Sequence, residues 1–158
     1  MHVIIKEFEG HILNYIGDSI MVVFGAPQKL KNHENQAVEC ALKMKKQLEE
    51  LNTKWDDNKL SRYWKNHGID SITMRTGIHT GSVIAGNIGS PEMLQYSTIG
   101  DTVNVASRLE QANKEFNTEI SFSHEIYTAL EEEFFEISKL SGEITLKGRT
   151  SPTKVYSI

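Results

Sequence analysis

Residues 11–24, HILNYIGDSIMVVF, contain two apolar runs on either side of a Gly-Asp pair. The runs are His11–Ile16 and Ser19–Phe24, and Gly17 and Asp18 join them. Two β-rich runs separated by two turn-forming residues are typical of a tight β-hairpin. The stretch therefore predicts a hairpin with Asp18 at its tip. A carboxylate there suits a hard cation such as Mg²⁺, although Asp is also an ordinary turn residue, and both interpretations stay open.

Helical patterns flank this hairpin. Residues 3–8 are typical of the end of a helix, with Gly10 as the expected left-handed stop. Downstream, apolar residues recur every three or four positions from Glu34 to Leu51, which predicts a long amphipathic helix. Residues 52–70 are mostly polar, and we interpret them as a surface insertion that its two tryptophans hold in place.

The remaining residues alternate between strand and helix patterns. They predict a second hairpin from 72–79 and 82–87, a strand at 94–99, a helix from Asp101 or Thr102 to Asn113, a strand at 119–123, a short helix at 125–130, and closing strands at 135–138, 143–146 and 154–158. Helices mixed with mostly antiparallel strands indicate an α+β fold, in which one sheet carries helices on one face.

Composition limits the class of protein. The chain has 158 residues, of which 39% are hydrophobic and 24% charged, as expected for a single globular domain. Its formal net charge of −4 argues against non-specific binding to nucleic acid. The single cysteine, Cys40, cannot form an internal disulfide, so we expect a buried thiol in a reducing, cytoplasmic setting.

Several polar residues could carry chemistry. Asn104 and Arg108 lie four residues apart on the predicted helix, which places an amide beside a guanidinium on one face. Such a pair can hold a phosphoryl group while its charge shifts, but a solvated helix face has the same pattern. Arg75, in a predicted strand, and Lys147 with Arg149, around Gly148, add cations that surface positions would also explain.

Four longer stretches together resemble a known family. In order and approximate spacing they resemble class III adenylyl and guanylyl cyclase catalytic domains, and the resemblance covers nearly the whole chain. The stretches are IGDSIMVVFGAP (16–27), MRTGIHTGSVIAGNIGS (74–90), YSTIGDTVNVASRLE (96–110) and LKGRTSPTKVYSI (146–158).

The resemblance implies a ferredoxin-like nucleotidyl cyclase fold, with helices packed on an antiparallel sheet. It also implies a homodimer with active sites at the interface, which uses two Mg²⁺ or Mn²⁺ ions to convert ATP or GTP to a 3′,5′-cyclic nucleotide and pyrophosphate. By the same resemblance, Asp18 is the second of two metal-binding aspartates and Asn104 orients the ribose. Arg108 would stabilise the transferring phosphoryl group, and Arg75 would reach the triphosphate. Arg149, with Lys147 beside it, would bind the terminal phosphates.

Base choice depends on two positions. Adenylyl cyclases resemble one another in a lysine where this chain has Asn14, and guanylyl cyclases have a glutamate there. An amide can both donate and accept, so Asn14 suits either base. The partner position is Ser97, whose hydroxyl is nearer the threonine of some adenylyl enzymes. We therefore favour ATP and keep GTP as the alternative.

The chain departs from the family pattern at its start. The first strand, which carries the other metal-binding aspartate, and the first helix are absent, so residues 1–158 correspond to a single partial domain. We expect this chain alone to be inactive, while its parent protein, which could be membrane-tethered, is active. The vacant strand position would lie between the strand ending near Phe24 and the one carrying Arg75, which predicts a strand-swapped or otherwise non-native dimer.

Two functions from other classes compete with the enzyme. The first is a non-catalytic regulatory or dimerising domain that kept the fold and lost the metal site. The second is an RNA-binding sheet, which the acidic balance and the lack of paired aromatic residues on a central strand argue against. The presence of Asp18, Asn104 and Arg108 together favours the enzyme, because a scaffold has no need of all three.

Overall fold

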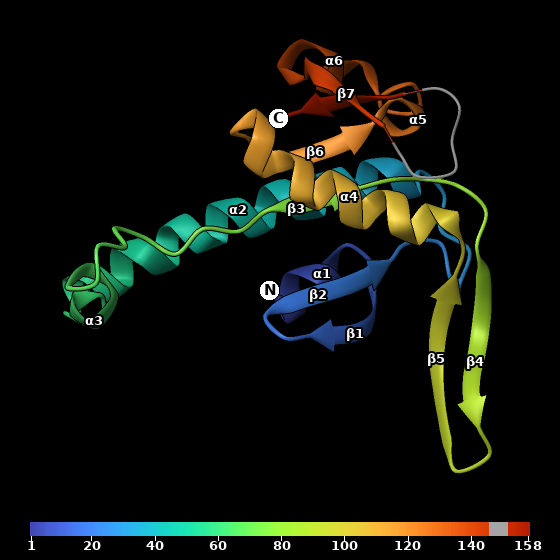
Figure 1. Cartoon of the computed structure of the whole chain (residues 1–158), viewed down its shortest axis with the longest axis horizontal. Helices are drawn as coiled ribbons and strands as arrows, with labels where there is room; N and C mark the ends of the chain where they lie inside the picture. Colours follow the sequence, from blue (N-terminus) through green and yellow to red (C-terminus); the bar gives the residue numbers. More distant parts are fainter. Residues whose placement is uncertain (146–151) are drawn as a thin grey trace.

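The computed structural model of the chain describes residues 1–145 and 152–158, and it has the expected mixture of helices and strands (Figure 1). In chain order the elements are α1 (His2–Glu7), β1 (His11–Ile16), β2 (Ser19–Val23), α2 (His33–Asp57), α3 (Arg62–Lys65), β3 (Thr76–Ile78), β4 (Ile84–Ser90), β5 (Met93–Ile99), α4 (Asp101–Phe116), β6 (Ile120–Ser123), α5 (His124–Tyr127), α6 (Glu132–Ile137), β7 (Lys139–Ile144) and β8 (Thr153–Ser157).

The described strands form three sheets in place of the single sheet that we expected. A four-stranded sheet has the order β3-β6-β8-β7, and β1-β2 and β4-β5 are separate two-stranded sheets. Strand β3 runs parallel to β6, whereas all other neighbours are antiparallel. Strands β2 and β3 are not hydrogen-bonded to each other. This break falls where the family pattern would place an additional strand.

The β1-β2 hairpin confirms the prediction for residues 11–24. Its register pairs Ile16 with Ser19, so Gly17 and Asp18 form the turn. Gly17 has a φ of 61°, which a glycine adopts without the steric cost that a side chain would bring.

The end of α1 corrects the role given to Gly10. The left-handed residue is Glu9, with a φ of 57°, and the Gly10 amide donates to the carbonyl oxygen of Ile5 over 2.8 Å. Glycine is needed at position 10 for space, because a Cβ there would lie 2.8 Å from Ile5 Cγ2 and 2.9 Å from Phe24 Cζ. Close packing of the chain against α1 and β2, and not backbone conformation, therefore explains this glycine.

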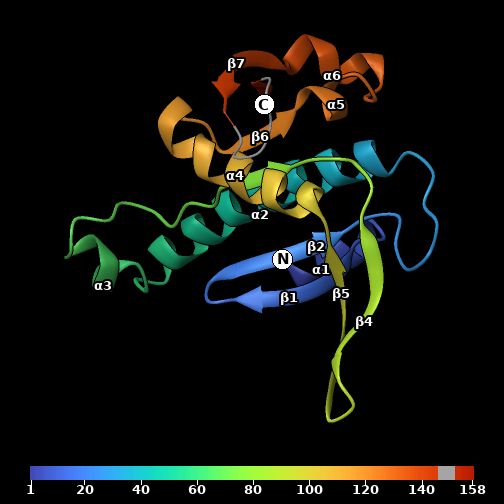
Figure 2. The ribbon, with the colours of Figure 1, turned by 45° about the vertical axis from the view of Figure 1, so that its right-hand side comes forward.

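The second predicted hairpin, from residues 72–79 and 82–87, is wrong. Strand β3 pairs in parallel with the distant β6, while β4 pairs with β5 from Ile84 opposite Ile99 to Ser90 opposite Met93. Local patterns indicate which residues are extended, but not a partner that is far away in sequence. The β4-β5 hairpin extends away from the other elements as an arm (Figures 1 and 2).

Two further boundaries differ from the predictions. Helix α2 continues past Leu51 to Asp57, so the first part of segment 52–70 is helical. Its end packs on α3 through an edge-to-face contact of Trp55 and Trp64, with ring centroids 5.7 Å apart. The strand expected at 135–138 is instead the end of α6, which buries Phe134 and leaves most of its other residues outside the core. That segment 52–70 is an insertion remains a prediction.

The core lies where α2 and α4 pack on the strands. Helix α2 contributes Val38 and Ala41 to a cluster with Ile120 and Phe122 of β6. Cys40 lies on the other side of α2, 3% exposed as predicted, and burial raises the pKa of its thiol to about 11. No helix in residues 1–145 or 152–158 is long and apolar enough to cross a membrane.

The backbones of β3 and α4 lie very close together at Gly77. A Cβ on Gly77 would overlap the carbonyl oxygen of Ala106 and the amide nitrogen of Glu110. Because both atoms belong to a helix backbone, the clash cannot be relieved by turning a side chain. Only glycine lets α4 lie this near to β3.

We predict that Gly77→Ala lowers the free energy of unfolding by about 1–3 kcal/mol, the usual cost of overpacking. Gly86→Ala is the matched control, because a Cβ at Gly86 would meet no atom within 4 Å, and we expect a change of under about 0.5 kcal/mol. Denaturant unfolding of both variants measures the difference. Equal stability of the two variants would contradict the close β3-α4 contact.

Candidate functional site

Helix α4 presents the two polar residues that the sequence singled out. Val105, Leu109 and Ala112 are buried on one side of the helix, as predicted. Asn104 and Arg108 are exposed on another side. Neither side chain has a hydrogen bond or ion pair with any other residue that the structure describes. An amide and a guanidinium therefore stand side by side, available to a ligand; we call them the α4 polar pair.

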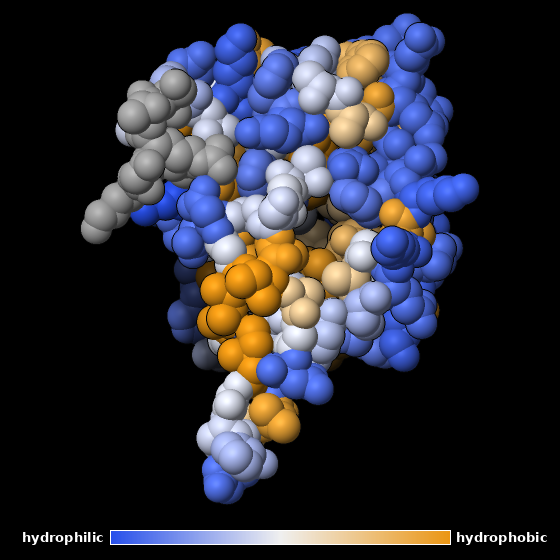
Figure 3. All heavy atoms as spheres, turned by 90° about the vertical axis from the view of Figure 1, so that its right-hand side faces the viewer, coloured by the Kyte–Doolittle hydropathy of each residue, from blue (hydrophilic) through white to orange (hydrophobic). Residues whose placement is uncertain are grey.

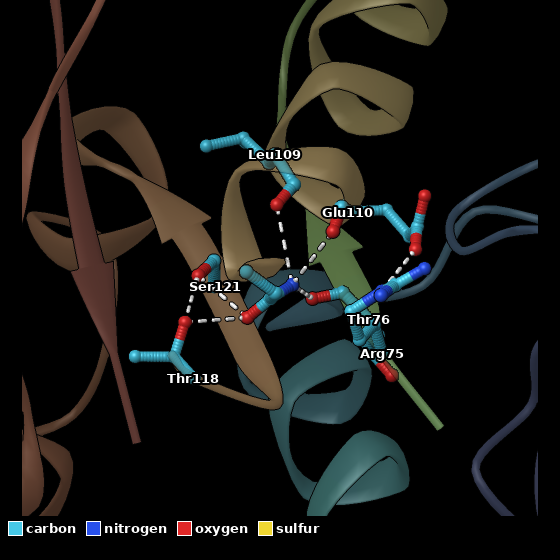
Figure 4. A network of polar contacts seen from close by, with 7 residues as sticks. Arg75, Thr76, Leu109, Glu110, Thr118 and Ser121 are labelled. Carbon is cyan, nitrogen blue, oxygen red and sulfur yellow. Dashed lines mark hydrogen bonds and ion pairs between the residues drawn. The ribbon is translucent and has the colours of Figure 1, made fainter. Parts of the chain in front are cut away.

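The far end of α4 is held by a buried amide that the sequence analysis did not identify. Asn113 is 1% exposed, and its Nδ2 donates to the carbonyl oxygen of Thr76 in β3 over 2.9 Å (Figure 4). The same nitrogen lies 3.2 Å from the carbonyl oxygens of Leu109 and Glu110, one helical turn back. Three acceptors for two N–H groups mean that one of these bonds is shared.

The oxygen of the same amide binds β6 and the loop before it. Asn113 Oδ1 accepts hydrogen bonds from Thr118 Oγ1 and Ser121 Oγ, each over 2.8 Å. The two hydroxyl oxygens are themselves 3.1 Å apart (Figure 4). One amide thus joins α4 to β3 and β6. The sequence feature that could have identified Asn113 is that this polar residue lies on the apolar side of α4, next to Ala112.

Arg75, expected to reach a triphosphate, is bound within the chain. Its Nε donates to Glu110 Oε1 on α4 over 2.9 Å (Figure 4). The two side chains are 47% and 37% exposed, so water screens the pair and it adds little to stability. It does fix the direction of Arg75 beside α4. Glu110 was the second residue that the sequence analysis missed.

Asp18, the predicted metal ligand, is exposed at the β1-β2 turn. In Figures 1 and 2 this turn lies at the end of the hairpin away from the β4-β5 arm. No group of three or more His, Cys, Asp or Glu side chains that could hold a metal ion occurs among the described residues. Asp18 is thus a single candidate ligand, and the described residues do not by themselves form a metal site.

The two positions expected to face the base lie on neighbouring elements. Asn14 is exposed on β1, and Ser97 is half-buried on β5. The strands touch through Gln95 Nε2, which donates to the Leu13 carbonyl oxygen over 2.9 Å. No hydrogen bond joins Asn14 to Ser97 in the structure. The last two predicted residues, Lys147 and Arg149, lie outside the described residues.

The predicted site residues are therefore spread over separate parts of the chain. Asp18 is on the β1-β2 turn, the α4 polar pair is on the helix that follows β5, and Asn14 and Ser97 lie where β1 meets β5. Within the described residues, no hydrogen bond or ion pair joins Asp18 to α4.

The β4-β5 arm carries exposed apolar side chains. Ile84 and Met93 are 75% and 79% exposed, and Leu94 and Ile99 are more than half exposed. Figure 3 shows apolar side chains gathered along the arm and at its base. An exposed apolar surface of this kind, rimmed by polar residues, is typical of a protein–protein contact.

Comparisons with known proteins show which family the chain resembles. A family model described as the adenylate and guanylate cyclase catalytic domain matches residues 1–158. Adenylate cyclase 1 of Rhizobium meliloti is 32% identical over 155 residues, which are 98% of this chain and 22% of that protein. The chain thus spans about a fifth of the length of this curated relative.

Two solved structures are similar over almost the whole chain. The guanylyl cyclase Cya2 is 28% identical with a TM-score of 0.77, and the match covers 99% of this chain and 73% of that one. The guanylate cyclase domain of RhGC from Catenaria anguillulae, solved in complex with GTP, is 26% identical with a TM-score of 0.74, covering 98% of this chain and 75% of that one.

Proposed function

The chain belongs to the adenylate and guanylate cyclase catalytic domain family, a class III cyclase family of lyases, and on that premise we propose that it takes part in converting ATP to 3′,5′-cyclic AMP and pyrophosphate. The observation that carries the proposal is the α4 polar pair. Its two side chains are exposed, have no partner among the described residues, and have the chemistry that a transferring phosphoryl group requires.

The proposed reaction is an in-line displacement. The 3′-oxygen of the ribose forms a bond to the α-phosphorus, the bond from that phosphorus to the β-bridging oxygen breaks, and the 3′-hydroxyl proton passes to solvent. Charge accumulates on the non-bridging phosphoryl oxygens. Arg108 donates from a planar, permanently charged fork to these oxygens, and Asn104 holds the ribose so that the 3′-oxygen is in line.

A divalent metal ion fits this proposal only in part. Asp18 offers a carboxylate at an exposed turn, which is a suitable ligand for Mg²⁺ or Mn²⁺. Such an ion supplies positive charge to the triphosphate when it is bound. We assign Asp18 one coordination position and no further role.

We place the active site between two copies of the chain. The separation of Asp18 from the α4 polar pair supports this, because both chemistries are needed at one phosphoryl group. The exposed apolar surface of the β4-β5 arm supports it as well, since association with a second copy would remove Ile84, Met93 and Leu94 from water. A strand-swapped dimer of the isolated chain, and its lack of activity, remain predictions.

The choice of ATP over GTP depends on Ser97 and Asn14. Adenine N1 accepts a hydrogen bond, whereas guanine N1–H and its amino group donate, so a hydroxyl and an amide can serve adenine. Guanylate cyclase activity is the second candidate. The similarity to Cya2 and RhGC favours it, and the amide of Asn14 can turn to accept from guanine.

A non-catalytic dimerising domain is the remaining alternative. A cyclase assay of the full-length protein with ATP and with GTP, each with Mg²⁺ and Mn²⁺, separates the three functions. Cyclic AMP production supports our proposal, cyclic GMP production supports the second candidate, and neither product supports the dimerising domain.

We predict that Arg108→Ala in the full-length protein lowers kcat by about 10²–10³, the usual loss of a transition-state donor. Arg108 is exposed, so thermal stability should be unchanged. Lys114→Ala removes another exposed cation from the same helix and should keep the wild-type rate. A similar rate for the two variants would remove Arg108 from the site.

Base choice gives the next prediction. Asn14→Lys should raise the ratio of ATP to GTP turnover, because a lysine side chain can donate to adenine N1 but cannot accept from guanine. Asn66→Lys, which adds the same charge beside α3, should leave the ratio unchanged. If Asn14→Lys also leaves the ratio unchanged, position 14 does not face the base.

A further inference from the structure

The buried amide of Asn113 is on the same helix as the α4 polar pair. Asn113 lies five residues after Arg108 and nine after Asn104 on the same helix. At 3.6 residues per turn these are about one and a half and two and a half turns. Because a helix moves as a nearly rigid rod, a rotation about its axis or a shift along it at one residue also moves the other residues of the helix. The contacts that orient α4 at Asn113 therefore also orient Asn104 and Arg108.

Apolar packing alone fixes this orientation poorly. Val105 and Leu109 hold α4 near the strands, and contacts of this kind are non-directional. Gly77 lets the helix lie close to β3, but it does not by itself fix the rotation of α4 about its axis. Hydrogen bonds are directional: their donor angles prefer values above about 150°, and the bonds weaken steeply below about 120°.

The Asn113 bonds reach two different strands. Nδ2 donates to Thr76 in β3, and Oδ1 accepts from Ser121 in β6. Because the amide is planar, both bonds are satisfied together at one rotation of α4. At the opposite end of α4, Thr102 Oγ1 donates to the Ser82 carbonyl oxygen over 2.9 Å, and this bond is exposed to water. Asn113 is thus the buried link.

The bonds of Asn113 also lead to Arg75, one of the cations proposed for the phosphates. Thr76, which accepts from Asn113, follows Arg75 directly in the chain. Glu110 offers its carbonyl oxygen to Asn113 and its carboxylate to Arg75 (Figure 4). Arg75 and α4 are therefore joined by one connected group of bonds.

We infer that Asn113 is a positioning residue for the cyclase reaction, and this rests on the proposed function. It holds α4 at the rotation that presents Asn104 and Arg108 to the nucleotide. A rotation of about 10° moves an atom about 6 Å from the helix axis by about 1 Å. A displacement of that size at a reacting group can lower a rate about 10²-fold.

The test separates the β3 side of the link from the β6 side. Asn113→Asp keeps the acceptors for Thr118 and Ser121 but replaces the donor that binds the Thr76 carbonyl oxygen. Thr118→Val removes one bond to Oδ1 and leaves the bond to β3 in place. Both variants lose buried hydrogen bonds, so both should lower Tm. Only the first should turn α4 relative to β3.

In the full-length protein at pH 8, well below each variant's Tm, we expect Asn113→Asp to lower kcat about tenfold or more, with KM within about twofold of wild type. Thr118→Val should keep kcat within about twofold. If Asn113→Asp does not fold, Asn113→Ser, which is neutral and too short to reach Thr76, makes the same comparison.

The outcomes are distinct. A wild-type kcat for the Asn113 variant would overturn the positioning role and leave the proposed function intact. The same holds if kcat falls in both variants only in proportion to the fraction of protein that is folded. No turnover by the wild-type protein with ATP or GTP would overturn the proposed function and the positioning role with it. A loss confined to kcat in the Asn113 variant supports both.

Discussion

Helix α4 crosses β3 with only the hydrogen atoms of Gly77 between their backbones, and a single buried amide, Asn113, fixes the helix there. Burying that amide would cost free energy if its N–H groups and oxygen lacked partners, but five hydrogen bonds satisfy it. A polar group that is so fully bonded specifies one geometry more sharply than apolar packing does. The α4 polar pair lies on the helix of this crossing, and Arg75 directly precedes its strand.

The α4 polar pair is exposed, and no carboxylate among residues 1–145 and 152–158 pairs with it. Asp18 lies on the turn of a separate hairpin, and the β4-β5 arm extends into water with Ile84 and Met93 largely exposed. The exposed apolar arm and the separation of the proposed site residues have one explanation in common. Association of two chains would bury the arm and bring the carboxylate of one chain to the polar pair of the other.

The sequence was a good guide where local chemistry decides the structure. The β1-β2 hairpin follows from Gly17 and its flanking apolar runs, and the exposed placement of Asn104 and Arg108 follows from helical periodicity. It was a poor guide where the partner is distant. The parallel pairing of β3 with β6 has no local signal, and neither does the bond from Arg75 to Glu110. Asn113 stood on the apolar stripe of α4, but only the fold reveals the carbonyl and hydroxyl groups that satisfy it.

In the dimer that we propose, Asp18 and Arg108 of one active site come from different chains, and co-expression of two inactive variants tests this. Asp18→Asn and Arg108→Ala should each be inactive alone. Mixed dimers would contain one site with both residues intact, so random pairing should restore about a quarter of wild-type turnover. If both residues served a site within one chain, every site in the mixture would carry a defect. If mixed dimers form but restore no cyclic nucleotide production, Asp18 and Arg108 do not meet across the dimer interface.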